Sequence, residues 1–523
     1  MNQTKPIVIA GILGILLLAF VALNFTQPPQ TRTTQQEQAP LGLVPKKFSP
    51  IKETQTVELK DNEKFLLSAD NVEREILGQK VFWFGYNNQS PGPLLKVKQG
   101  TSAVIEFKNN LEFPTTVHWH GLRLENEFDG VPEVTQKEIM PGESFEYKLD
   151  FQDPGLYWYH PHVREDLQQE MGLYGTILVE PENKTLPKAQ EEVLVLDDLL
   201  LSNSGIPAFF EATNFAAMGR FGNVYLVNGK TGYSLETTAG KILRFYLVNA
   251  ANARPFRFAI EGTRLKVIGA DAGFYEKPFF ADNVTLGPSE RGIVEVFLET
   301  EGEYRILNST PVSTAELGKI IALPGKVLLE EKKEFETLEQ DTVFLEELEK
   351  LERFFGSEPD FEYELLIRWP VMDRMMGHMA GSMGGMHTGP DGIEWEDSMM
   401  PINEITTSDE VTWIIRDKKT GKENMDFFHT VKKGEIKKIR ITNLENSSHP
   451  MQHPIHLHGN RFLVLSVDGK PSQNLVWKDT VLIPTERTVD LLVEFSNPGD
   501  WMIHCHIAEH LSSEMMSRIK VVE

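Results

Sequence analysis

The chain has 523 residues, which is enough for about three domains of ordinary size. Its 76 acidic and 52 basic residues give a net charge of -24, which excludes nucleic acid as an expected partner because phosphate binding needs a positive surface. Hydrophobic residues make up 41% of the chain and aromatic residues 10%, and repeated Pro-Gly pairs together with one Asn-Gly pair favour β structure.

The N-terminus carries an almost unbroken apolar run at residues 6–25, long enough to span a bilayer. A cleaved signal peptide has a shorter apolar core and a small-residue cleavage site, and no good site follows here. An uncleaved membrane anchor is therefore preferred to a removed signal. Residues 26–40 are rich in Gln, Thr and Pro and predict a flexible tether. We expect residues 1–45 to hold the remaining chain outside the cytoplasm, in the periplasm or at the cell surface.

Three related segments follow. The hexapeptide HWHGLR at 118–123 recurs as HLHGNR at 456–461, and a middle copy at 259–264 keeps the Gly and Arg but lacks both histidines. A second element also repeats: Pro-Gly is followed at the same spacing by HPH at 160–162 and by HCH at 504–506. In the middle copy the corresponding positions after Gly302 are Leu307 and Ser309. The repeats predict domains at 46–185, 186–345 and 346–523, with the chemistry in the first and third.

Short alternating runs such as 103–107 and 488–495 indicate a β-sandwich or barrel in each domain. Residues 330–360 are strongly acidic, and 342–355 has the apolar spacing of a helix. This segment is interpreted as a connector that enters the third domain. The third region also contains a methionine-rich insert at 372–400.

Histidine pairs of the form His-x-His are the main chemical signal. Random placement of the 14 histidines would give about 0.4 such pairs, and four occur, at 118/120, 160/162, 456/458 and 504/506. On a strand, residues i and i+2 face the same side, so each pair aims two imidazoles at one place. Imidazole suits copper, zinc, iron and nickel. Eight such ligands predict a cluster of about three ions between the first and third domains.

The chain has a single cysteine, Cys505, placed between two of these histidines. On a strand it would face away from them and bind a different ion. His453, His510 and Met515 lie nearby in the sequence, and two histidines, a thiolate and a weak methionine ligand make a blue-copper electron-transfer site. An electron that enters there has a short bonded path to the cluster.

Together these motifs resemble the multicopper oxidase family, and the resemblance covers almost everything after about residue 50. It implies an all-β fold of three cupredoxin-like Greek-key domains, each a β-sandwich or barrel, holding one type 1, one type 2 and two type 3 copper ions. The implied activity couples four one-electron substrate oxidations to the reduction of dioxygen to water. The implied ligands are His453, Cys505, His510 and Met515 for type 1, His118 and His456 for type 2, and His120, His160, His162, His458, His504 and His506 for type 3.

Two acidic positions of the family bear on proton delivery. Asp129, nine residues after His120, matches the acid that serves this role in the family, although an aspartate before Gly130 is also a common turn residue. Several bacterial relatives carry a second acid directly after the histidine that matches His510. Here that position is Leu511, so no second relay residue is assigned.

The insert bears on the substrate. Residues 372–400 hold eight of the 17 methionines among several glycines, which indicates a flexible loop of soft ligands rather than a packed helix. Thioethers favour Cu(I), and the loop resembles the methionine-rich insert of copper-tolerance oxidases, which oxidise Cu(I). Residues predicted to contact substrate Cu(I) are Met451, Met372, Asp373, Met375 and Met376, with His449 where relatives carry an acid.

Other functions remain open at this point. A laccase would oxidise phenols or aromatic amines, and Fe or Mn oxidation is a third alternative. A copper-binding protein without oxygen chemistry is a different class, and the complete set of eight cluster histidines argues against it. The insert itself has the plainer alternative of being a flexible segment without function.

Overall fold

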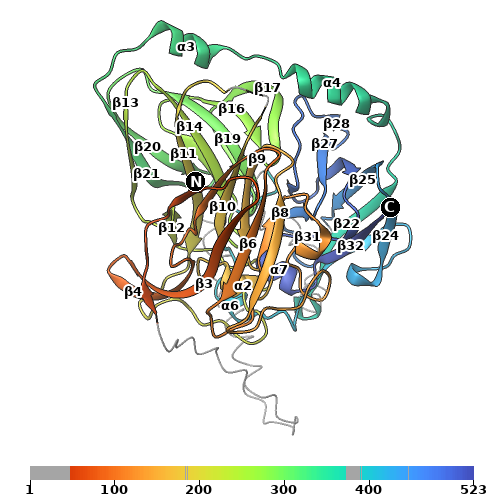
Figure 1. Ribbon diagram of the computed structural model, residues 1–523. Coiled ribbons are helices and arrows are strands. Elements are labelled where there is room, and N and C mark those ends of the chain that lie inside the picture. Colours follow the sequence, from red (N-terminus) through yellow and green to blue (C-terminus); the bar gives the residue numbers. More distant parts are fainter. Residues whose placement is uncertain (1–47, 183, 185, 373–388, 390, 446) are drawn as a thin grey trace, which may run out of the picture. The chain divides into compact units, whose positions relative to one another are not determined.

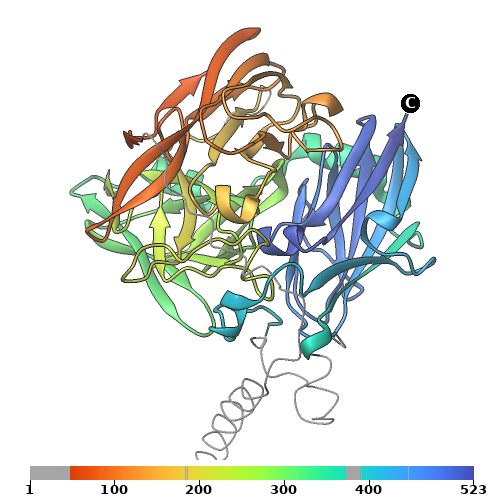
Figure 2. The ribbon, with the colours of Figure 1, turned by 90° about the horizontal axis from the view of Figure 1, so that it is seen from below.

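The computed structural model describes residues 48–182, 184, 186–372, 389, 391–445 and 447–523. In this part of the chain the strands form six sheets, which pair as three consecutive β-sandwiches coloured red to orange, yellow to green, and blue in Figures 1 and 2. Neighbouring strands in each sheet are mostly not consecutive in sequence, so the chain crosses repeatedly between sheets. The predicted all-β fold of three Greek-key domains is confirmed, and each domain is a β-sandwich.

The first sandwich shows the alternation that buries every second side chain. In β6, Ala103, Ile105 and Phe107 are buried and the residues between them are not. One sheet has the order β1-β3-β6-β8, with β4 on β3, and the other has the order β2-β5-β10-β9-β7. The strands are β1 (Ser49–Pro50), β2 (Thr56–Glu58), β3 (Glu63–Ile76), β4 (Gln79–Tyr86), β5 (Leu94–Lys98), β6 (Ser102–Asn109), β7 (His118–His120), β8 (Ser144–Asp150), β9 (Gly155–His160) and β10 (Gly175–Glu180).

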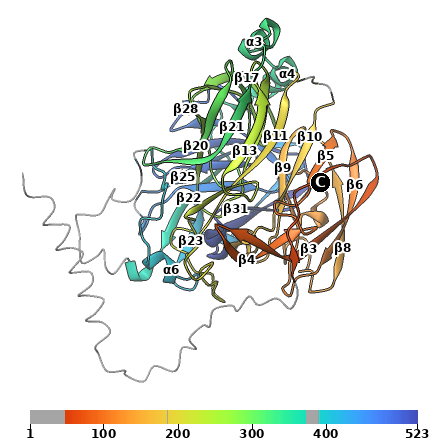
Figure 3. The same cartoon turned by 90° about the vertical axis from the view of Figure 1, so that its left-hand side faces the viewer.

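The second sandwich has an especially apolar sheet, in which β14 and β19 are buried along their whole length. Its sheets have the orders β12-β11-β14-β19-β16-β17 and β13-β21-β20-β15-β18, and Figure 3 shows β13, β21 and β20 side by side. The strands are β11 (Gln190–Leu199), β12 (Val224–Val227), β13 (Tyr233–Thr238), β14 (Ile242–Asn249), β15 (Phe256–Ile260), β16 (Leu265–Ala270), β17 (Gly273–Ala281), β18 (Val284–Leu286), β19 (Arg291–Phe297), β20 (Gly302–Ser309) and β21 (Thr314–Leu323).

The third sandwich repeats the strand order of the second, as β23-β22-β25-β30-β27-β28 and β24-β32-β31-β26-β29. The strands are β22 (Phe361–Arg368), β23 (Thr412–Asp417), β24 (Phe428–Lys432), β25 (Glu435–Asn443), β26 (His453–Leu457), β27 (Arg461–Val467), β28 (Lys470–Pro471), β29 (Thr480–Ile483), β30 (Thr488–Phe495), β31 (Gly499–Cys505) and β32 (Met516–Val522). Strand register supports the repeats found in the sequence, because corresponding residues face each other in all three sandwiches. These pairs are His118 with His160, Ala259 with Leu307, and His456 with His504.

Helices are few and lie between strands. The helix predicted at 342–355 is present as α4 (Thr342–Leu351) followed by η2 (Glu352–Phe354), and the side chain of Asp341 caps it. Phe344 and Leu348 of α4 are buried in a core cluster that contains residues of both the first and the third sandwich, so the acidic connector is packed on one face. The domain boundary predicted at 345 falls inside this helix. The other helices are α2 (Glu165–Gln168), α3 (Leu329–Glu336), α6 (Ile402–Ile405), α7 (Ala508–Ser512), η1 (Asn126–Phe128) and η3 (Asn424–Asp426).

None of the helices in the described residues has the length and hydropathy that a membrane span requires. The anchor predicted at residues 6–25 and the tether at 26–40 lie outside the described part of the chain.

Candidate metal centre

Eight histidines meet where the first sandwich contacts the third. In each of these sandwiches, two neighbouring antiparallel strands bring the two His-x-His pairs together, β7 with β9 and β26 with β31. Between the sandwiches, the rings of His120 and His456 stack at 3.7 Å and those of His118 and His458 lie 4.0 Å apart. Only the 118/120 pair lies wholly on a strand, because the second histidine of each other pair follows the strand's last residue.

Several ring nitrogens face each other in a way that requires a cation. Nδ1 of His458 donates to Asp129 and Nδ1 of His504 donates to the Cys505 carbonyl, so neither Nε2 carries a hydrogen. Those two Nε2 atoms nevertheless lie 2.9 Å apart. Two lone pairs at this distance repel each other unless a metal ion binds both.

Other nitrogens of the cluster are buried without a hydrogen-bond partner among the described residues. They are Nε2 of His118, His162 and His456, and Nδ1 of His120. Nδ1 of His506 is also unpaired, but this ring faces the cluster through Nε2, which lies 3.3 Å from His160 Nε2. Buried polar atoms are normally satisfied, so a group of close, unpaired imidazole nitrogens indicates a site that binds metal ions. The donor set therefore fits imidazole-bound metal ions, and copper is among those that imidazole suits.

Two buried aspartates orient four of these rings. Asp129 follows η1 and accepts at Oδ2 from His458 Nδ1 (2.9 Å) and at its backbone oxygen from His118 Nδ1 (2.8 Å). Asp479 precedes β29 and binds His120 Nε2 through Oδ1 (3.0 Å) and His456 Nδ1 through its backbone oxygen (2.9 Å). Such contacts decide which nitrogen of each ring is left for a metal.

Burial sets the charge state of the cluster. It is the main cause that lowers the pKa of seven histidines below the ordinary 6.5, so they are neutral, the form that binds a metal. These are His120, His160, His162, His456, His458, His504 and His506. Burial would raise the pKa of Asp479, but the guanidinium of Arg291 more than offsets this and holds it well below the usual range.

A separate site surrounds the cysteine. Sγ of Cys505 lies 3.5 Å from Nδ1 of His453 and 3.8 Å from Nδ1 of His510, the histidine on α7. The flanking His504 and His506 face the cluster instead, as strand alternation predicts. Met515 is fully buried in the same core, and its carbonyl accepts from the Cys505 N–H. His453, Cys505 and His510 lie close enough together to hold one metal ion, and with Met515 they have the side-chain chemistry of a blue-copper site.

The thiol has features of a metal ligand. Burial raises its pKa above the ordinary 9.0, so a nearby cation is needed to favour the thiolate. The backbone N–H of Ile507 points at Sγ from 3.4 Å and stabilises negative charge there. Trp413 of β23 stacks on His510 with ring centroids 3.9 Å apart and meets His453 edge-on at 4.9 Å. The indole therefore fixes both imidazoles.

The predicted substrate residues are only partly described. Met451 is fully buried in the core that contains Cys505 and Met515, and Met372 packs against that core. Met451 precedes β26, so strand alternation does not govern its direction. Asp373, Met375 and Met376 lie outside the described residues.

Part of the insert differs from the prediction of a flexible loop. Asp397 accepts from the backbone N–H groups of Met399 and Met400 at 2.7 and 3.0 Å, and Met399 is buried in the core. Glu394 exchanges two hydrogen bonds with Gln452, the residue before His453. The prediction of flexibility is therefore wrong for 391–400, because long-range contacts fix this segment beside the cysteine site.

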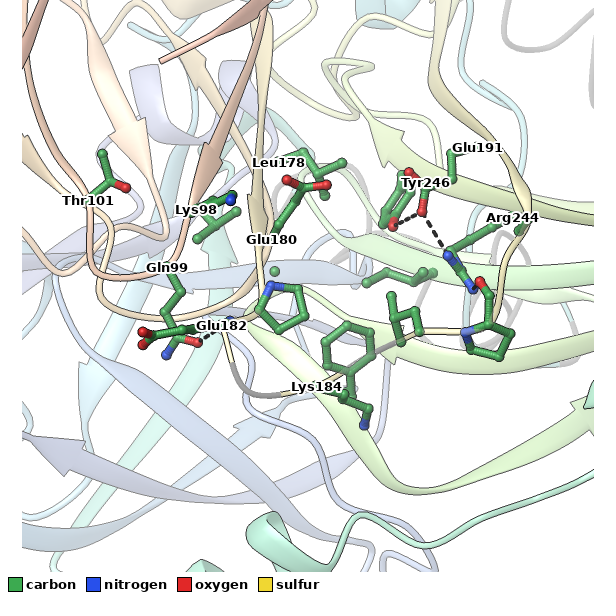
Figure 4. A pocket seen from close by; sticks show the side chains of 18 of the residues that line it. Lys98, Gln99, Thr101, Leu178, Glu180, Glu182, Lys184, Glu191, Arg244 and Tyr246 are labelled. Atoms are coloured by element: carbon green, nitrogen blue, oxygen red, sulfur yellow. Dashed lines mark hydrogen bonds and ion pairs between the residues drawn. The ribbon is translucent and has the colours of Figure 1, made fainter. Parts of the chain in front are cut away.

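A cavity of about 370 Å³ leads to the cluster between the first and third sandwiches. It is lined by His162 and by Leu511, the position where an acid was missing. Glu165 lies in the same cavity, with Oε1 3.0 Å from His162 Nδ1. A larger cavity of about 800 Å³ lies between the first two sandwiches and holds no ligand histidine (Figure 4). Its lining mixes lysines with glutamates, so it has no part in the metal centre.

Three residues at these sites were not singled out from the sequence: Asp479, Trp413 and Glu165. Asp479 and Trp413 contact histidines from other parts of the chain, and no local spacing marks them. Glu165 is three residues after His162, and that short spacing was the one available signal.

Comparison with known proteins places the chain. Three family models described as multicopper oxidase match residues 69–184, 198–322 and 396–523. The multicopper oxidase mco of Staphylococcus aureus is 28% identical over 454 residues, which are 84% of each chain.

Solved structures share the fold. A multicopper oxidase from Campylobacter jejuni, described as a metallo-oxidase, superposes with a TM-score of 0.68 at 23% identity, over 92% of this chain and 98% of that one. The laccase-like CueO of Ochrobactrum sp., described as active on lignin model compounds, gives 0.67 at 22% identity, over 90% and 100%. The chain belongs to the multicopper oxidase family, whose members are copper-dependent oxidoreductases with dioxygen as the acceptor.

Proposed function

We propose that this protein is a cuprous oxidase, which oxidises Cu(I) outside the cytoplasm while anchored through residues 6–25. The proposal of two separate copper sites rests on one observation. Cys505 faces His453 and His510, whereas its sequence neighbours at 504 and 506 face the histidine cluster. The first set, with Met515, is the proposed type 1 site. His118 and His456 are the proposed type 2 ligands, and His120, His160, His162, His458, His504 and His506 the type 3 ligands.

Copper bound at these residues would supply the one-electron steps that link the substrate to dioxygen. The protein itself supplies the electron-transfer path between the two proposed copper sites. The Cys505 backbone joins the sulfur covalently to His504 and His506, and the Cys505 carbonyl also accepts a hydrogen bond from His504 Nδ1 at 2.8 Å. Both routes run through residues 504–506, which are fully buried, so little reorganisation of water accompanies the transfer.

The proposed proton carrier is Asp129. Its Oδ2 accepts from His458, and its Oδ1 lies 3.3 Å from His118 Nδ1, whose hydrogen is already given to the Asp129 carbonyl. Oδ1 is therefore the atom at which a proton is held and returned. Dioxygen needs four protons and four electrons to become two water molecules, and four Cu(I) ions supply those electrons as they become Cu(II).

Thioethers beside the cysteine site favour Cu(I) as the substrate. Met451 and Met372 belong to or pack against the core that contains Cys505, and Glu394 of the insert is hydrogen-bonded to Gln452, between Met451 and His453. A laccase-type activity on phenols or aromatic amines is the alternative, and Fe or Mn oxidation a third. The known relatives divide in the same way between a metallo-oxidase and a laccase-like enzyme.

Oxygen uptake by the copper-loaded protein, supplied with Cu(I) or with dimethoxyphenol, tests the proposal. Replacing residues 373–388 by a Gly-Ser linker should lower kcat/KM for Cu(I) and spare or raise that for the phenol. Met451→Leu should lower kcat/KM for Cu(I) about 10-fold or more. Met171→Leu, at a buried methionine of the first sandwich, is the matched control and should change neither. A preference for phenol that neither change alters would favour the laccase.

A further inference from the structure

The second sandwich has no copper ligand, yet one of its side chains reaches the cluster. Arg291 begins β19 and is fully buried. Nη1 donates to Oδ1 of Asp479 in the third sandwich at 2.7 Å, and Nη2 bonds the other oxygen of the same carboxylate. Nε donates to the carbonyl of Leu156 in the first sandwich at 2.9 Å. One guanidinium thus joins all three sandwiches.

The carboxylate that Arg291 holds is a direct partner of the cluster. Oδ1 of Asp479 lies 3.0 Å from Nε2 of His120, and Thr480 Oγ1 lies at the same distance. An ionised carboxylate only accepts hydrogen bonds, so Nε2 of His120 carries the hydrogen. The lone pair left for a metal is then on Nδ1, the nitrogen of His120 that is buried without a partner.

His120 differs in this respect from the rings around it. His118, His456 and His458 are bonded at Nδ1 and leave Nε2 for a metal. His120 instead leaves Nδ1 for a metal, and this depends on the carboxylate of Asp479 that accepts a hydrogen bond from its Nε2. A bidentate arginine fixes the plane of a carboxylate better than a single bond does.

Gly121 provides the space for this pair. Its φ is +87°, and a Cβ at this position would collide with Oδ2 of Asp479 and lie 3.1 Å from Nη2 of Arg291. The glycine of the HWHG motif thus accommodates the ion pair directly beside His120.

We propose that Arg291, from the sandwich that binds no copper, is a positioning residue of the trinuclear centre, because it holds Asp479 in the plane that fixes the metal-binding nitrogen of His120. This inference rests on the proposed copper centre. Arg291 touches neither copper nor dioxygen in this scheme and acts only through Asp479.

The test compares Arg291→Gln with Arg244→Gln in the copper-loaded full chain. Arg244 is a matched control, because it is equally buried in the same sheet and pairs with Glu295 of the same strand β19. It also bonds Glu191 at the large cavity, away from the cluster (Figure 4). Copper per chain, loss of copper to a chelator, and the electron paramagnetic resonance of the type 2 and type 3 ions are measured, with blue absorption as the internal reference.

We expect Arg291→Gln to lose cluster copper to the chelator roughly 10–100-fold more readily, to alter the resonance signals of the cluster, and to keep the blue absorption. Arg244→Gln should keep all three properties. Arg291→Lys keeps the positive charge but not the bidentate guanidinium, so its copper loss should lie between that of Arg291→Gln and that of the unaltered protein. If Arg291→Gln does not fold, Arg291→Lys replaces it in the test. Equal copper retention and unchanged signals in the Arg291 and Arg244 variants would overturn the inference. Failure of the unaltered protein to show any blue or cluster signal would instead refute the proposed function.

Discussion

Two buried aspartates, one from each ligand-bearing sandwich, hold the cluster in the same way. Each uses its backbone oxygen for a histidine of its own sandwich and its carboxylate for a histidine of the other sandwich. The histidines so held are His118 and His458 by Asp129, and His456 and His120 by Asp479. Each of the two sandwiches therefore helps to orient a histidine of the other.

Asp479 and Asp129 differ in whether a positively charged side chain pairs with the carboxylate. Asp479 has the guanidinium of Arg291 across both oxygens, whereas no lysine or arginine in the described part of the chain lies within ion-pair distance of Asp129. An acid with a fixed cation stays ionised and acts as a rigid support. Asp479 is therefore a fixed support for His120, whereas Asp129 is the proposed proton carrier.

The largest expected effect comes from Asp479→Asn. This change breaks the bidentate ion pair of the buried Arg291 and leaves it with Asp271, 3.6 Å away, as its remaining carboxylate. Breaking a buried pair in this way costs up to about 3–5 kcal/mol of the free energy of unfolding. His120 also loses its ionic partner, so cluster copper should fall with the stability. Urea midpoints of the copper-free protein and copper content after loading measure the two losses.

Asp129→Asn is the matched control for that change. It leaves no buried cation unpaired, so we expect a loss of about 1 kcal/mol, the size of a weakened hydrogen bond. Oxygen uptake should instead slow roughly 10²–10⁴-fold, the usual contribution of a positioned proton carrier. Equal losses of stability in the two variants would remove the distinction between support and carrier.

The metal-binding side chains were far easier to predict from the sequence than the residues that orient them. All eight histidines and Cys505 follow from spacing and repetition, because neighbouring strands bring each short motif together. Asp479 could not be found this way, since its partners His120 and Arg291 lie 359 and 188 residues away along the chain. The choice between sandwich and barrel was open for a related reason, because alternation shows which side of a strand is buried and not which strand lies beside it. Residues 391–400 were misjudged because Gln452 and the core, not local composition, fix them.

A glycine shared by the two ligand-bearing repeats gives a smaller and sharper test. Gly121 and Gly459 follow equivalent His-x-His pairs and both have positive φ, but a Cβ at Gly459 would meet the ring of Trp501 and not an ion pair. Alanine should cost about 1–3 kcal/mol at either position, through crowding and backbone strain. Only Gly121→Ala should also disturb cluster copper, as measured by its resonance signals. Equal disturbance by both variants would show that crowding alone explains the effect.

The last comparison is with a buried acid that, unlike Asp479, forms no ion pair with an arginine in the described part of the chain. Glu394 is 3% exposed, and burial together with Asp397 raises its pKa to about 8, the opposite of the shift at Asp479. The folded state therefore binds this proton more tightly than the unfolded state, whose pKa is near 4.5. Stability from this group is present in acid and is lost as pH rises from 4.5 towards 8, with a slope of at most about 1.4 kcal/mol per pH unit. Glu394→Gln should flatten that part of the urea midpoint against pH, and an unchanged slope would show that burial without a cation does not produce the shift.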